Sequence, residues 1–244
     1  MVGRHGSGTI FFAYCNLGCL YCQNYSISQQ GEGSIASREE LAEMMLSLQR
    51  KGCHNINLVS PTHVVPYILE ALEVAVRRGL HLPLVYNSGG YDAIETLKLL
   101  DGIIDIYMPD MKYSDEVIAE QLSGIKNYPR VNRAAVKEMH RQVGDLKIDE
   151  AGVARRGLLV RHLVLPHGLA GTKEIASFLA REISTNTYLN IMAQYHPCYQ
   201  AFNLPQLARP LSQAEFAEAI NLAHQQGLCR LDKHNIPLPR LTPR

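Results

Sequence analysis

Short apolar runs alternate along the chain with longer segments in which apolar residues recur at helical spacing. The short runs are rich in β-branched and aromatic residues and begin near Thr9, Asn55, Leu82, Ile103, Leu158 and Tyr188. This alternation predicts six successive βα units, and it predicts a parallel sheet because each parallel crossover needs a helix. Runs such as INLV and LPLVYN are apolar throughout, as the strands of a helix-covered sheet require. We therefore expect an α/β fold, a partial TIM-type (β/α)6 barrel.

Capping and breaking residues mark the ends of the expected helices. Ser37 with Glu40 forms a capping-box signature before a helix that ends at Gly52. Asp92 with Glu95 gives a similar start signal for the third helix. The other helices are expected at 64–78, at 129–143, at 172–183, and from Ser212 with Glu215 to Gly227.

One segment departs from this alternation. Residues 146–157 alternate apolar and polar positions around a turn at 150–152, which predicts a β-hairpin inserted before the fifth strand. We expect a single domain over 1–244, with six strands between residues 9 and 200 and a C-terminal helix and tail over 211–244. The last dozen residues contain three prolines and are expected to be extended. Whether a further segment precedes the first strand stays open.

Charge and hydropathy exclude several classes of partner. The chain has 24 basic and 23 acidic residues and a net charge of +1, so it has no electrostatic footprint for nucleic acid or an anionic membrane. No apolar run approaches the roughly 18 to 20 residues that span a bilayer, and the N-terminus has no signal-peptide pattern. We therefore expect a cytoplasmic protein, whose thiols stay reduced.

Polar and small residues gather where the expected strands end. In parallel α/β folds the chemistry lies at the C-terminal ends of the strands, which meet at one rim. After strand one these ends are Ser60–His63, Asn87–Gly90, Pro109–Lys112, Pro166–Gly168 and Gln194–His196. Arg161 and His162 lie within the fifth strand itself.

Three cysteines, Cys15, Cys19 and Cys22, lie in the loop that follows the first strand. In a reducing compartment, thiols so closely spaced point to a metal rather than to disulfides. Structural zinc needs four ligands and ferredoxin-type clusters use four cysteines, whereas this triplet leaves one position open. His5 precedes the strand and is expected at its opposite end. Of the other cysteines, Cys198 is expected near the same rim.

The spacing Cys-x-x-x-Cys-x-x-Cys, with the aromatic Tyr21 just before the last cysteine, resembles the radical S-adenosylmethionine (SAM) superfamily. The resemblance extends along nearly the whole chain. Segments such as NINLVSPTHVVPYILEAL and DIYMPDMKY are similar to the group related to pyruvate formate-lyase activating enzyme. The resemblance to the superfamily implies that the three cysteines hold a 4Fe–4S cluster, and that Tyr21 lies at the cofactor site. It further implies that SAM occupies the open iron and is cleaved reductively to a 5′-deoxyadenosyl radical, which abstracts hydrogen from a substrate.

The same resemblance assigns roles to the ends of strands two and three. Relatives often carry Gly-Gly-Glu after strand two, where it contacts the SAM amino group. Here Ser60 and Thr62 occupy that place, and a turn with a helix cap is the alternative reading. Asn87 and Ser88 correspond to residues that bind the ribose or the carboxylate, or else to a plain turn.

The later strands carry further cofactor contacts by the same resemblance. Asp110 and Lys112 resemble an Asp-x-Lys element that lies near SAM, with an exposed ion pair as the alternative. Arg161 matches the arginine of Arg-x-x-x-x-Pro that reaches the SAM carboxylate, and a guanidinium within an apolar strand needs an anionic partner. Gln194 begins a Gln-Tyr-His stretch that resembles a Pro-Tyr-His element near adenine or substrate.

Three functions stay open at this point. The first is a radical SAM enzyme that acts on a glycyl-radical-type protein partner or on a small molecule, with flavodoxin or ferredoxin as the low-potential electron donor by analogy. The second is a non-enzymatic iron–sulfur protein that transfers electrons and does not cleave SAM. The third is a zinc-binding structural domain.

Overall fold

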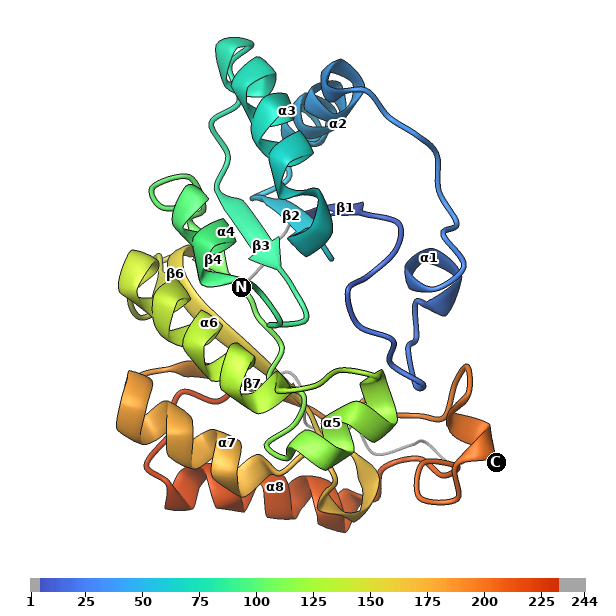
Figure 1. The fold of residues 1–244 in the computed structure, drawn as a ribbon. Helices are drawn as coiled ribbons and strands as arrows, with labels where there is room; N and C mark the ends of the chain where they lie inside the picture. The colour runs from blue at the N-terminus through green and yellow to red at the C-terminus, as the bar shows by residue number, and fades with distance from the viewer. Residues whose placement is uncertain (1–4, 233–244) are drawn as a thin grey trace, which may run out of the picture.

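The computed structural model of the protein describes residues 5–232, whose arrangement is shown in Figure 1. The expectation for the extended last dozen residues falls outside this range. Within residues 5–232, no helix combines the length and the apolar character needed to cross a membrane.

The strands form a single sheet, seven in number within residues 5–232 (Figure 1). They are β1 (Gly8–Phe11), β2 (Ile56–Val59), β3 (Leu84–Asn87), β4 (Ile106–Tyr107), β5 (Lys147–Ile148), β6 (Ala154–Leu163) and β7 (Tyr188–Met192). Apart from β5, the strands are neighbours in chain order, and each neighbouring pair is parallel. The expected α/β fold with six parallel strands is confirmed.

The short strand β5 pairs antiparallel with β6, which confirms the hairpin expected over 146–157. Asp149 closes its turn, because its side chain accepts a hydrogen bond from the Val153 N–H at 2.9 Å and its carbonyl accepts one from the Gly152 N–H at 2.9 Å. Among the described residues no pairing joins β1 to β7, so the parallel array is an open, partial barrel.

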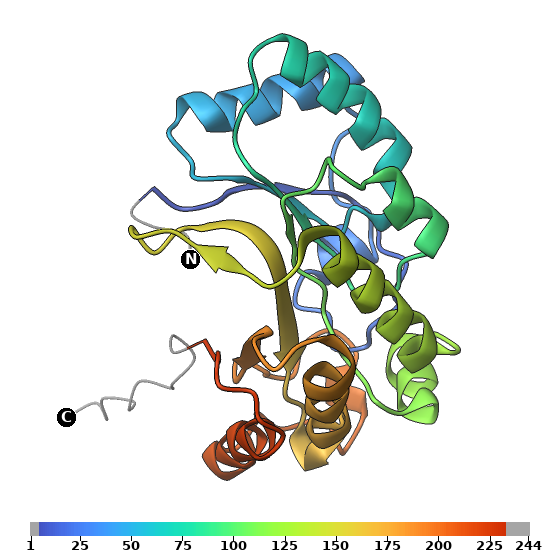
Figure 2. The same cartoon turned by 90° about the vertical axis from the view of Figure 1, so that its left-hand side faces the viewer.

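The helices cover the sheet from outside. They are α1 (Tyr25–Ser28), α2 (Arg38–Arg50), α3 (Val65–Arg77), α4 (Ile94–Leu99), α5 (Glu116–Ser123), α6 (Tyr128–Val143), α7 (Thr172–Phe178) and α8 (Gln213–Gln225). Figure 2 shows α2, α3, α4 and α6 gathered on one side of the curved sheet. Their apolar stripes, including Met45, Ile68, Leu97 and Met139, form one buried core with strand residues such as Leu58. Burial of each such side chain contributes about 1.5–3 kcal/mol, which fixes the helices against the sheet.

Local capping explains where several helices begin. Ser37 and Ser212 both form complete capping boxes, in which the serine accepts from the N3 backbone N–H and the N3 glutamate accepts from the serine N–H. Both were expected from the sequence. The expectation that Asp92 starts the third helix is wrong, because α4 begins after Ala93 without a side-chain cap. The Asp92 carboxylate is instead buried and accepts hydrogen bonds from hydroxyl groups.

Helix α5 was absent from the sequence-based expectations. Asp115 caps it by accepting a hydrogen bond from the Ile118 N–H at 2.9 Å, and Gly124 ends it in the left-handed conformation at φ 65°. At eight residues it is too short to show more than two turns of helical spacing. The helix expected over 172–183 also differs, since α7 is followed by a π-helical turn at Leu179–Ile183.

Candidate functional site

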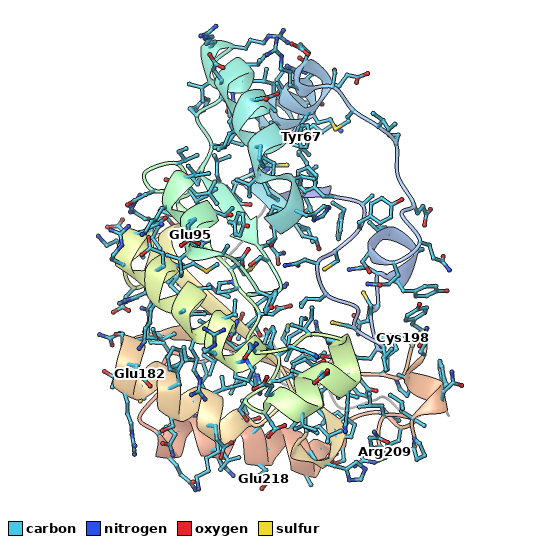
Figure 3. The ribbon with its side chains drawn as sticks, in the orientation of Figure 1. Tyr67, Glu95, Glu182, Cys198, Arg209 and Glu218 are labelled. Atoms are coloured by element: carbon cyan, nitrogen blue, oxygen red, sulfur yellow. The ribbon has the colours of Figure 1, made fainter. Side chains whose placement is uncertain are left out.

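The cysteine loop follows β1 and is held by backbone hydrogen bonds to distant segments. The Gly18 N–H donates to the Ser123 carbonyl at 3.0 Å, and the Leu20 N–H donates to the Leu122 carbonyl at 2.9 Å. The free carbonyls at the C-terminus of α5 thus serve as acceptors for the loop. On the other side, Cys198 lies against the loop and its thiol donates to the Tyr21 carbonyl at 3.4 Å (Figure 3).

A cavity of about 340 Å³ opens between this loop and the ends of the strands. Nine of the twelve residues singled out in the sequence border it. They are Cys15, Cys19, Cys22, Ser60, Asn87, Ser88, Asp110, Lys112 and Arg161. The parallel topology therefore brings residues 146 positions apart to one rim, as expected from the strand ends. Thr62, Gln194 and Tyr21 are not among the residues that border the cavity.

The three thiols border the cavity. Within residues 5–232, no three His, Cys, Asp or Glu side chains converge to hold one metal ion. In an iron–sulfur cluster each cysteine binds a different iron, so the thiolates need not converge on one atom. Burial raises the pKa of Cys19 to about 11, while the nearby Lys112 ammonium acts in the opposite direction. The buried thiol is therefore neutral at pH 7 and must lose a proton to bind iron.

A largely buried charge cluster also borders the cavity. Asp110 lies 2.7 Å from Lys112 Nζ and 2.7 Å from Arg161 Nη2. Burial opposes ionisation of Asp110, but the two cations outweigh it and lower the pKa of this carboxyl group. Asp110 in turn raises the pKa of Lys112 well above its ordinary value, despite burial. Asp110 and Lys112 are therefore both charged at neutral pH. The exposed ion pair considered for these two residues is wrong, since their side chains are only 13% and 16% exposed.

Besides the Asp110 oxygen that faces Arg161, two buried polar atoms of residues that border the cavity have no hydrogen-bond partner. They are Arg161 Nε and Asn57 Oδ1. The contact between Arg161 and Asp110 is an ion pair that lacks hydrogen-bond alignment, so the guanidinium keeps donor capacity. Buried polar atoms are normally paired, and both residues border the cavity. A donor and an acceptor are thus available to a polar ligand, and the amino acid moiety of SAM carries both an acceptor carboxylate and a donor ammonium.

The ends of β2 and β3 are joined through Asp92, which sequence reasoning assigned to a helix cap. Its carboxylate accepts hydrogen bonds from Thr62 Oγ1 at 2.7 Å, Tyr86 OH at 2.9 Å and Ser88 Oγ at 2.7 Å. Burial raises the pKa of Asp92, and the hydroxyl donors partly offset that rise. Thr62 is therefore committed to Asp92, while Ser60, at a positive φ of 56°, borders the cavity. An acid at a polar strand end was the only sequence signal for this role.

Tyr21 and Gln194 do not border the cavity, and both make contacts with other residues. Tyr21 is buried, and its hydroxyl lies 2.6 Å from the hydroxyl of Tyr113. Its ring packs edge-on against Tyr195, with ring centroids 6.0 Å apart. The Gln194 side-chain amide contacts Met192 Sδ at 3.5 Å, and its carbonyl accepts a hydrogen bond from Gln23.

The fold and the rim define an α/β-barrel protein whose cysteine loop and strand ends border one cavity. The family model described as the radical SAM superfamily matches residues 9–159, more than half of the chain, and the chain belongs to this superfamily. Members use a 4Fe–4S cluster and SAM, which are therefore the cofactors of this protein.

Two archaeal proteins of Methanocaldococcus jannaschii are similar along most of the chain. Uncharacterized protein MJ0674 is 32% identical over 232 residues, and Uncharacterized protein MJ0808 is 25% identical over 232 residues. Each alignment covers 91% of this chain but only 63% and 62% of the two relatives. The chain therefore spans less than two thirds of their length.

Solved structures share the fold at low sequence identity. A radical SAM methyltransferase from Sphaerobacter thermophilus has a TM-score of 0.60 and 13% identity, covering 90% of this chain and 64% of that one. Native anSMEcpe with bound AdoMet and Cp18Cys peptide has a TM-score of 0.62 and 13% identity, covering 90% and 58%. The FeFe-hydrogenase maturase HydG from Carboxydothermus hydrogenoformans has a TM-score of 0.58 and 15% identity, covering 92% and 52%. These similarities extend to the fold alone.

Proposed function

We propose that Cys15, Cys19 and Cys22 hold the 4Fe–4S cluster and that SAM binds in the cavity between this loop and the strand ends. The observation that carries the proposal is the composition of one cavity, which three thiols and a largely buried charge cluster both border. With both cofactors bound, the superfamily chemistry is one-electron cleavage of SAM to methionine and a 5′-deoxyadenosyl radical, which takes a hydrogen atom from the substrate.

The charge cluster suits the amino acid moiety of SAM. Arg161 offers its unpartnered Nε–H to the carboxylate, and Asn57 offers its unpartnered Oδ1 to the ammonium group. Asp110 holds the Arg161 guanidinium in place. Its negative charge also reduces the repulsion between Arg161 and Lys112. Ser60 and Asn87 border the same cavity and supply further polar contacts, for the amino group and for the ribose or carboxylate. Ser88 borders it as well, but its hydroxyl group already donates to Asp92.

Two classes of substrate are compatible with this site. The Asp110-x-Lys112 element and the placement of Arg161 support a relationship to pyruvate formate-lyase activating enzyme, and hence a glycyl-radical-type protein partner. A small-molecule substrate fits the same cavity. The reduction needs a low-potential, one-electron source, and a flavodoxin or ferredoxin is the donor that we propose by analogy.

The assignment is tested by anaerobic reconstitution with iron and sulfide, followed by dithionite and SAM. We expect 5′-deoxyadenosine and methionine in equal amounts, measured by chromatography. The variant Cys19→Ala should lose the cluster absorbance, whereas the matched control Cys229→Ala, an exposed cysteine, should retain it. A fully loaded protein that never cleaves SAM would favour the electron-transfer alternative, and zinc in place of iron would favour the structural one.

The proposed SAM contact has its own test. The variant Arg161→Met should still load the cluster but bind SAM at least tenfold more weakly, because a charged hydrogen bond to the carboxylate is lost. Electron paramagnetic resonance of the reduced protein with and without SAM measures this binding. An unchanged SAM affinity would remove Arg161 from the site.

A further inference from the structure

Two serine hydroxyl groups lie at hydrogen-bond distance from sulfur atoms of the cysteine loop. Ser123 Oγ is 3.0 Å from Cys19 Sγ, and Ser28 Oγ is 3.0 Å from Cys22 Sγ. Both serines are buried, with 1% and 8% of their surface exposed. Each is the last residue of its helix, Ser123 of α5 and Ser28 of α1. Two separate helices therefore present a hydroxyl group to the loop.

Ligation by iron fixes the direction of these hydrogen bonds. A cysteine that binds iron is a thiolate and has no proton to donate, so the Ser123 hydroxyl must donate to Cys19 Sγ. Its oxygen then accepts from Tyr113 OH at 2.6 Å, which in turn accepts from Tyr21 OH at 2.6 Å. The buried chain from Tyr21 to Cys19 thus has one polarity, and each bond in it polarises the next.

Ser28 has a similar, shorter arrangement. Its hydroxyl group donates to Cys22 Sγ once that sulfur is a thiolate, and its oxygen accepts from the Gln29 side-chain amide at 3.4 Å. Gln29 also donates to the Leu17 carbonyl at 2.9 Å, which ties the amide to the cysteine loop. The Gln29 amide therefore orients the Ser28 hydroxyl group, as Tyr113 orients that of Ser123.

We propose that Ser28 and Ser123 are positioning residues that set the reduction potential of the iron–sulfur cluster through hydrogen bonds to two of its ligand sulfurs. The proposal rests on the assignment of the three cysteines as cluster ligands. One-electron reduction adds negative charge to the cluster and its thiolates, and a hydrogen-bond donor stabilises the reduced form more than the oxidised form. Each serine therefore raises the potential, which lets a donor reduce the cluster more easily.

The test is a redox titration of the reconstituted full-length protein, with dithionite and mediators supplying the single electron. The reduced cluster is followed by electron paramagnetic resonance. Ser123→Ala and Ser28→Ala should each lower the ratio of reduced to oxidised cluster at a fixed potential by roughly fivefold. At 59 mV per tenfold for one electron this is a shift of about 40 mV to more negative potential. The two serines contact different sulfurs, so the double variant should show roughly the product of the two effects.

Tyrosine variants separate this role from a merely structural one. Tyr113→Phe leaves Ser123 in place but removes the donor behind it, so it should shift the potential in the same direction by a smaller amount. Tyr107→Phe is the matched control, because it removes a buried hydroxyl group that bonds Gln142 at 2.6 Å, away from the cysteines. It should leave the potential unchanged.

The outcomes distinguish failure of this inference from failure of the proposed function. If wild-type protein takes up no iron and sulfide, the cysteine assignment fails. If it loads and both serine variants keep the wild-type potential, or shift it positively, the serine inference is refuted while the cysteine assignment stands. If Ser123→Ala cannot retain a cluster, Tyr113→Phe decides for that serine, and an unchanged potential there refutes its role.

Discussion

Gly90 lies at a point of close backbone contact after β3, and its replacement tests the packing of the rim. Its φ is +72°, and a Cβ at this position would lie 2.2 Å from the Asp110 carbonyl oxygen and 2.3 Å from Asn132 Nδ2. That carbonyl oxygen also accepts hydrogen bonds from Asn132 Nδ2 at 2.9 Å and from Tyr128 OH at 3.1 Å. The variant Gly90→Ala must therefore displace backbone, because the shortest contact is with the Asp110 carbonyl oxygen and not with a side chain.

Two effects contribute to the expected destabilisation. The left-handed conformation costs an alanine about 1–2 kcal/mol relative to glycine. Overpacking against a fixed backbone adds about 1–3 kcal/mol. Gly102 provides the matched control, since its φ is +78° and a Cβ at this position would meet no atom within 4 Å among the described residues. Gly102→Ala should therefore show only the conformational cost.

Urea unfolding of both variants measures the difference. We expect Gly90→Ala to lose about 2–5 kcal/mol of unfolding free energy and Gly102→Ala about 1–2 kcal/mol. In thermal unfolding each kcal/mol corresponds to about 2–4 °C for a chain of this size. If the two alanine variants are equally stable, the close approach between the β3 loop and Asp110 is absent from the folded protein, and the geometry of the rim is wrong there.

Three further predictions concern charge and capping. Asp110→Asn leaves two buried cations without their anion and should cost about 3–5 kcal/mol in urea unfolding; a loss below about 1 kcal/mol would contradict the buried cluster. The hydrogen bond from Arg141 lowers the pKa of Glu138 from 4.5 to about 2, so its stabilisation is present above pH 4.5 and is lost as the pH falls towards 2. Glu138→Gln should flatten the dependence of the urea midpoint on pH in that window, and an unchanged slope would refute this. Ser212→Ala breaks a capping box and should cost about 1 kcal/mol, against no change if the cap is unimportant.

The sequence predicted the parallel sheet and the rim because both depend on local periodicity and on a general rule of topology. Successive βα units place all the strand ends on one side of the sheet. That Cys15 and Arg161 border one cavity could therefore be predicted without knowing which side chains they contact. The capping boxes were equally accessible, because their hydrogen bonds are made within four residues. Helix α5 was missed since eight residues show too little of a 3.6-residue period.

The commitments of individual side chains could not be predicted in the same way. Thr62 and Tyr21 occupy the right loops, yet their hydroxyl groups bond to Asp92 and Tyr113, which are 30 and 92 residues away. Such pairings depend on rotamers chosen by tertiary packing, which no local pattern records. Asp92 shows the converse error, because its spacing to Glu95 matches a helix cap while burial directs its carboxylate to hydroxyl groups.

The hydrogen bonds of the cysteine loop also have a consequence for biosynthesis. Cys19 is separated from Ser123 by 104 residues, and the Leu20 carbonyl accepts a hydrogen bond from the Gln200 N–H at 2.9 Å. At about 5–20 residues per second, the ribosome needs on the order of 10–35 seconds to extend the chain from this loop to residue 200. During that interval the cysteine loop lacks some of the later segments to which it is hydrogen-bonded in the folded protein. Delivery of iron and sulfide into a finished pocket is therefore a late event, after most of the chain has been synthesised.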